Sequence, residues 1–252
     1  MKTIDAKLPG YVDLFVEGNS TNHIIRRDFV EEYDQLKLGV SKRTIERHNF
    51  IKPIIDAGIT FFKELGIHGY TIDYYLTKHI PKGYNLSSDE MLKAFTVYGL
   101  NEVMDTKLSH DELINIGNKM SINLDAYISN DSVFFNQEGI ILDNNKKDND
   151  IYYLLVKLPE SFTREELVRY FMVDESLLME LSDLSRYEPL IYIKKVLKEC
   201  NAKIISTNGY SDILVASFYD VHDRFKASQE LSAYESKKIS RGNGYSYLKC
   251  YR

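Results

Sequence analysis

Both halves of the chain interleave strand-like runs with amphipathic helices, and the first half does so without regular strand–helix alternation. Residues 3–17 alternate loosely between apolar and polar positions, which predicts a strand or hairpin with Pro9-Gly10 as a bulge or turn. Residues 50–65 instead place apolar side chains at helical spacing, with Pro53 in the first turn and Gly66 at the stop. This mixture favours an α+β architecture over a parallel, doubly wound sheet.

The remaining segments continue the mixture and predict two units. The polar, non-periodic stretch 144–150 marks the boundary, which gives an N-terminal domain of residues 1–147 and a C-terminal domain of residues 148–252. Further strands are predicted at 70–76, 133–142, 152–157, 203–206 and 213–218, with an edge strand within 240–252. Further helices are predicted after Ser87 and at 109–120, 163–170, 174–183, 189–199 and 223–231.

Composition excludes several classes of function. The 252 residues carry a net charge of -5, which argues against a general nucleic-acid or membrane-surface role. The two cysteines, Cys200 and Cys250, lack the spacing of a zinc or redox motif, so we expect no metal site. No segment has the apolar length of a membrane span, and residues 1–18 lack the apolar core of a signal peptide. We therefore expect a cytoplasmic protein, and its oligomeric state stays open.

Several short segments share their order with a known family. The chain opens with Ala6-Lys7-Leu8-Pro9, and residues 80–89 read Ile-Pro-Lys-Gly-Tyr-Asn-Leu-Ser-Ser-Asp before a predicted helix. Residues 119–127 read Lys-Met-Ser-Ile-Asn-Leu-Asp-Ala-Tyr, and residues 206–211 read Ser-Thr-Asn-Gly-Tyr-Ser. Together with His23, Ser182-Asp183-Leu184 and Glu188-Pro189, these segments resemble the GHMP kinase superfamily, most closely the 4-diphosphocytidyl-2-C-methylerythritol kinases.

The resemblance implies an N-terminal domain like ribosomal protein S5 domain 2, a ferredoxin-like C-terminal domain and an active site in the cleft between them. It implies ATP and Mg²⁺ as cofactors if the chain is active, and a small molecule as ligand. The positions that match catalytic residues of the family are Lys7, Asn123 and Asp125. The positions that match its phosphate-binding loop are Pro81, Gly83, Asn85, Ser87 and Ser88. The positions that match substrate contacts are His23, Ser206, Gly209 and Ser211.

Three of the matching motifs are damaged. Successive glycines would let backbone N–H groups approach a phosphate, but here only Gly83 remains, followed by the side chains of Tyr84 and Asn85. At the base position Asn123 carries an amide, which cannot accept a proton as a carboxylate can. The 206–211 segment has a threonine and a tyrosine where the family has glycine and proline. These changes predict an impaired kinase or pseudokinase that binds a small molecule or a partner in the old cleft.

Each matched position also has a purely structural interpretation. Ser87 is then an N-cap, Asp125 a turn or helix-cap carboxylate, Lys7 a solvated strand lysine, His23 a packing residue, and Asn208-Gly209 a hairpin turn. If residues 123–125 formed a strand, Asp125 would share a face with Asn123 and replace it as base.

Two other functions stay open. One is an active ATP-dependent kinase of 4-diphosphocytidyl-methylerythritol or another small alcohol, served by Lys7, Asp125 and the helix start at Ser87. The other is a regulatory interaction protein on the same scaffold.

Overall fold

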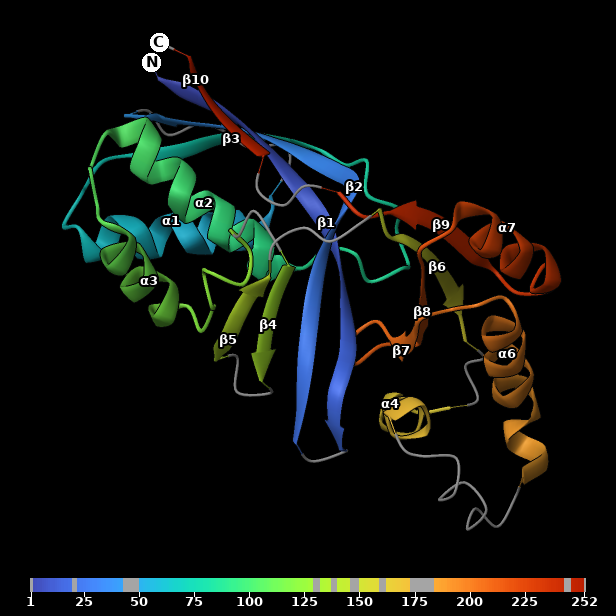
Figure 1. Ribbon diagram of the computed structural model, residues 1–252. Coiled ribbons are helices and arrows are strands. Elements are labelled where there is room, and N and C mark those ends of the chain that lie inside the picture. Colours follow the sequence, from blue (N-terminus) through green and yellow to red (C-terminus); the bar gives the residue numbers. More distant parts are fainter. Residues whose placement is uncertain are drawn as a thin grey trace.

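The fold consists of two antiparallel sheets with helices packed against each (Figure 1). The computed structural model describes residues 2–19, 22–42, 50–128, 132–136, 140–145, 150–158, 162–172, 184–242 and 246–251. The first sheet has the order β10-β1-β2-β4-β5 with β3 also paired to β2, and the second has the order β7-β8-β6-β9. The α+β prediction is thus confirmed.

The two long antiparallel strands β1 (Thr3–Asn19) and β2 (Asn22–Ser41) pair at the centre of the first sheet. Their register shifts between Pro9 and Tyr11, so Pro9-Gly10 is a bulge and not a turn. A side chain at position 10 would place its Cβ 2.9 Å from a Val30 methyl and 3.2 Å from the Leu86 carbonyl oxygen. Glycine therefore lets the 81–88 loop approach the two strands closely.

The other strands of the first sheet come from three parts of the chain. They are β3 (Thr71–Thr77), β4 (Ser132–Asn136), β5 (Ile141–Asn145) and β10 (Ser246–Tyr251). The prediction of an edge strand near the C-terminus is correct, and the strand pairs with β1 of the first sheet. Both termini therefore lie at the same end of this sheet (Figure 1).

Three helices cover one face of the first sheet and bury the main core (Figure 1). They are α1 (Lys52–Glu64), α2 (Asp89–Met104) and α3 (His110–Lys119). Ser109 caps α3 in a capping box with Glu112, as the sequence indicates. Gly66, at φ +63°, adopts the left-handed conformation just after α1, as its predicted role as the helix stop requires.

The second sheet builds a smaller core with the remaining helices. Its strands are β6 (Tyr152–Lys157), β7 (Ile204–Thr207), β8 (Ile213–Phe218) and β9 (Ser236–Ser240). The helices are α4 (Arg164–Met172), the 3-10 turn η1 (Leu184–Tyr187), α6 (Glu188–Glu199) and α7 (Val221–Glu230). The helix predicted at 174–183 lies outside the described residues. Among the helices that are described, none combines the length and the apolarity needed to span a membrane.

Asp28, fully buried on β2, ties the two sheets together. Its carboxylate accepts a hydrogen bond from the Tyr153 hydroxyl of β6 at 2.6 Å and another from Ser132 of β4. Arg26 donates to the same carboxylate at 3.0 Å, which supplies the opposite charge that a buried carboxylate needs. Burial, followed by the charge of Asp28, raises the pKa of Tyr153 well above its usual value, so this hydroxyl stays a donor.

Candidate functional site

The 81–88 loop buries two of its side chains, those of Tyr84 and Leu86, and leaves Asn85 exposed. Tyr84 is 8% exposed and Leu86 is 1% exposed, whereas Pro81 is half-buried and Gly83 is exposed. Gly83 and Asn85 both adopt positive φ, at +82° and +53°, in the left-handed region that glycine adopts readily. The Leu86 carbonyl oxygen then accepts a hydrogen bond from the Tyr11 N–H at 2.9 Å. The loop is therefore fastened to β1 through its main chain.

Ser88 caps the helix α2 that follows the loop. Its hydroxyl accepts a hydrogen bond from the Met91 N–H at 3.2 Å, in the geometry of an N-cap. The prediction that Ser87 is the cap is thus wrong by one residue, because Ser88 is the residue whose side chain reaches the third helical N–H. Ser87 itself is exposed. Asp89 and Glu90 fill the first turn and place negative charge beside the helix N-terminus.

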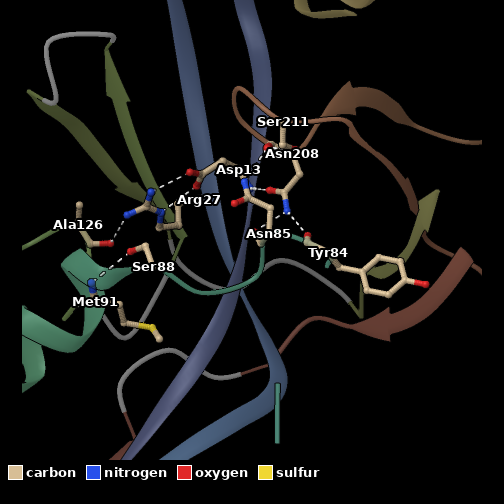
Figure 2. A network of polar contacts seen from close by, with 9 residues as sticks. All are labelled: Asp13, Arg27, Tyr84, Asn85, Ser88, Met91, Ala126, Asn208 and Ser211. Carbon is tan, nitrogen blue, oxygen red and sulfur yellow. Dashed lines mark hydrogen bonds and ion pairs between the residues drawn. The ribbon is translucent and has the colours of Figure 1, made fainter. Parts of the chain in front are cut away.

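Asn208, fully buried on the 206–211 segment, bridges this loop and β1 (Figure 2). Its amide nitrogen donates to the carbonyl oxygens of Tyr84 at 3.0 Å and Asn85 at 2.8 Å. Its amide oxygen accepts from the Asp13 N–H at 2.8 Å. In return the Asn85 side-chain amide donates to the Asn208 carbonyl oxygen at 3.0 Å. The loop and the segment that resemble two ligand-contacting motifs therefore bind each other.

The 206–211 segment takes in the end of β7 and most of the hairpin connection to β8, and its residues are buried except for Tyr210. Gly209, at φ +57°, donates its N–H to the Asp13 carbonyl oxygen at 2.9 Å. The Ser206 hydroxyl accepts from the Phe15 N–H at 3.0 Å, and the Ser211 hydroxyl donates to the Asn208 carbonyl oxygen at 2.7 Å. A hairpin is thus present as predicted, although its connection extends to Asp212 and is longer than two residues.

Asp13, which is half-buried, and Arg27, which is buried, form an ion pair beside this bridge (Figure 2). The Arg27 guanidinium donates to both carboxylate oxygens, from Nε at 2.8 Å and from Nη2 at 2.7 Å. Nη1 donates to the Ala126 carbonyl oxygen at 3.2 Å. Burial by itself would lower the pKa of Arg27, but the charge and hydrogen bonds of Asp13 outweigh it and raise that pKa above its usual value. Sequence reasoning missed this pair.

The 121–128 segment is a series of turns and not a strand. The condition under which Asp125 would share a strand face with Asn123 is therefore not met. The Asp125 carboxylate lies 2.7 Å from Nε2 of His110, and Nδ1 of His110 lies 2.8 Å from the Tyr98 hydroxyl. Asp125 is thus a turn carboxylate paired with the start of α3, and Asn123 is half-buried nearby in the chain.

Lys7 and His23 have contacts of their own. The Lys7 side chain is exposed, and its ammonium lies 4.3 Å from the centroid of the Tyr33 ring. His23 is 1% exposed, and its Nε2 lies 2.9 Å from the Tyr210 hydroxyl. The Phe15 ring packs edge-on against His23 at 4.8 Å. Whether Lys7 or His23 contacts a ligand stays a prediction.

The hydrogen bonds described for the 81–88 loop hold its carbonyl oxygens. The carbonyl oxygens of Tyr84, Asn85 and Leu86 each accept a hydrogen bond from a donor of the protein itself, whereas a phosphate would bind to N–H donors. Within the described ranges, no three His, Cys, Asp or Glu side chains gather in a way that could hold a metal ion.

Comparisons with known proteins agree on the fold. No protein-family model matches the chain. A solved 4-(cytidine 5'-diphospho)-2C-methyl-D-erythritol kinase superposes with a TM-score of 0.66 at 12% identity, covering 95% of this chain and 100% of that one. Homoserine kinase from Cytophaga hutchinsonii superposes with a TM-score of 0.65 at 14% identity, covering 99% of this chain and 97% of that one. The chain thus has the GHMP kinase fold, which confirms the predicted architecture.

Sequence similarity points to one group of kinases with this fold. A 4-diphosphocytidyl-2-C-methyl-D-erythritol kinase from Ruthia magnifica is 27% identical over 182 residues, which cover 67% of this chain and 63% of the relative. The chain therefore resembles the 4-diphosphocytidyl-2-C-methyl-D-erythritol kinases, as its motifs predict. It spans less than two thirds of the length of that curated relative.

Proposed function

We propose that this chain is a GHMP-fold kinase homologue that no longer transfers phosphate efficiently, and that it acts by binding a small molecule or a partner. The observation that carries the proposal is the Asn208 bridge. Its amide donates to the carbonyl oxygens of Tyr84 and Asn85 and so holds the loop that resembles a phosphate cradle in one conformation against the hairpin. If the loop had to rearrange around a triphosphate, these hydrogen bonds would break and leave polar groups to be satisfied again.

The candidate base supports the same proposal. Asn123 cannot accept a proton, and Asp125 is held by His110 at 2.7 Å. Lys7, which would stabilise charge on a transferred phosphoryl group, stacks on Tyr33 at 4.3 Å. None of these three residues is arranged here as an acid–base pair with another. The catalytic and substrate-binding assignments that rest on the resemblance remain proposals.

The alternative is an active kinase with a diverged site, acting on 4-diphosphocytidyl-methylerythritol or another small alcohol. Phosphoryl transfer depends mainly on positioning and electrostatics, so the loss of a base by itself does not exclude it. ATP and Mg²⁺ would then be the cofactors. Under either reading, we also propose that the chain divides into two domains near residue 147. We propose further that it lies in the cytoplasm and has neither nucleic acid nor a membrane as a partner.

Thermal unfolding with and without Mg-ATP tests the proposal. A ligand at one hundred times its dissociation constant stabilises the folded state by about 2.7 kcal/mol. We expect no such shift for this chain, while the 4-diphosphocytidyl-2-C-methyl-D-erythritol kinase from Ruthia magnifica serves as the positive control. A saturable shift with Mg-ATP, together with ADP release in the presence of 4-diphosphocytidyl-methylerythritol, would establish the active kinase instead.

A further inference from the structure

A bulge in β2 brings the first sheet against the end of β9 in the second sheet. Where the β1–β2 register shifts, β2 has three residues, 30–32, opposite one residue of β1. Within this bulge Val30 pairs antiparallel with Arg241, which directly follows β9. Because the two chains run in opposite directions, Glu32 comes close to Ile239 of β9. We call this place the bulge junction.

Arg224 of α7 reaches the same junction from the second sheet. Its Nη1 donates a hydrogen bond to the Ile239 carbonyl oxygen at 2.8 Å. Its guanidinium carbon lies 5.1 Å from the centroid of the Tyr152 ring of β6. The Nε atom is buried and has no hydrogen-bond partner among the described residues. The Nε–H of a cationic group is therefore left unsatisfied at the junction.

Glu32 carries the complementary defect. Its Oε2 is buried and accepts no hydrogen bond from the described part of the chain. Burial is the largest cause that raises the pKa of Glu32, with Glu31 adding to it, whereas the charges of Lys237 and Arg224 lower that pKa. Burial in turn lowers the pKa of Arg224, which Tyr152, Glu32 and Glu31 raise. The carboxylate and the guanidinium thus act on each other without forming an ion pair.

Two buried polar atoms of opposite character at one junction are costly as long as they stay apart. A buried donor or acceptor without a partner loses its hydrogen bonds to water and gains none in return. A rotation of the two side chains that brings the Nε–H of Arg224 to Oε2 of Glu32 satisfies both atoms at once. The guanidinium and the carboxylate can then pair in a fork.

We infer that Glu32 and Arg224 are the two halves of a latch between the sheets, which is open in this structure and closes as an ion pair. Glu32 belongs to the first sheet, whereas α7 packs on the second, so closure fixes one sheet against the other. The inference goes beyond the proposed function and does not rest on it, because the latch holds the sheets together whether or not the chain transfers phosphate.

Nitrogen-15 NMR of the full chain at near-neutral pH tests the latch through the Nε–H proton of Arg224. The signal is identified by its absence from Arg224→Lys, and its hydrogen exchange is compared in wild type and Glu32→Met. We expect exchange to be roughly tenfold faster in Glu32→Met, because the proton loses a charged acceptor. Glu31→Gln and Lys237→Gln are the matched controls, and both should keep the slow exchange of wild type.

Two results would overturn the inference. One is an Nε–H proton that exchanges equally fast in wild type and Glu32→Met. The other needs no variant: in a crystal structure of the wild type grown at near-neutral pH, Oε2 of Glu32 must lie within hydrogen-bond distance of Nε of Arg224. A pair that stays apart in that crystal refutes the latch.

Discussion

Replacement of Asn208 by alanine is the most informative single change to the proposed bridge. The substitution removes three side-chain hydrogen bonds, to the Asp13 N–H and to the carbonyl oxygens of Tyr84 and Asn85. A typical hydrogen bond contributes about 0.5–1.5 kcal/mol, and a buried group left without a partner costs about 1–3 kcal/mol. The Tyr84 carbonyl bond is buried, whereas the other two are partly buried, so water can replace part of the loss. We therefore expect the free energy of unfolding to fall by about 3 kcal/mol.

The assay is urea denaturation followed by circular dichroism, with Asn118→Ala as the matched control. Asn118 is an exposed residue of α3, where such a change is expected to alter stability by less than about 0.5 kcal/mol. Asn208→Asp should be at least as damaging as Asn208→Ala, because it places a carboxylate oxygen against the two carbonyl oxygens. Equal stabilities of Asn208→Ala and Asn118→Ala would refute the reasoning.

Two further predictions concern single side chains elsewhere. Burial is the largest cause that raises the pKa of Glu32 above its ordinary value. The folded state therefore holds the carboxyl proton more tightly than the unfolded state does. The free energy of unfolding falls as pH rises through the raised pKa of the folded state. Glu32→Gln should therefore become progressively more stable relative to wild type as pH rises above about 4.5, and a constant difference across urea titrations at several pH values would contradict this. Ser109→Ala should lower stability by about 1 kcal/mol, because the capping box of α3 loses its side-chain acceptor. Chemical denaturation that shows no loss for Ser109→Ala would count against the cap.

The helices of the first unit could be predicted because their signals are local. Pro53 and Gly66 mark the two ends of α1, and Ser109 with Glu112 marks the start of α3. β2 was missed over residues 22–41, because its sequence mixes charged and apolar residues without a clean alternation. β2 instead pairs with β1, and the register between the two strands shifts twice. β9 was also missed, since its five residues are mostly polar.

The contacts of the candidate site were beyond the reach of sequence reasoning because they join distant segments. Asp13 and Arg27 face each other only when the β1–β2 register is known, and that register depends on the two bulges. Opposite charges at paired strand positions are the signal that could have found them. Asn208 was correctly placed in a hairpin, but its reach to Tyr84 depends on how the two sheets pack.

A crystal structure determined after soaking with Mg-ATP tests the central claim most directly. The account predicts that Asn208 keeps its hydrogen bonds to Tyr84 and Asn85 and that no triphosphate is seated on residues 83–88. A triphosphate bound along that loop with its terminal group facing Lys7, and with the Asn208 contacts broken, would contradict it.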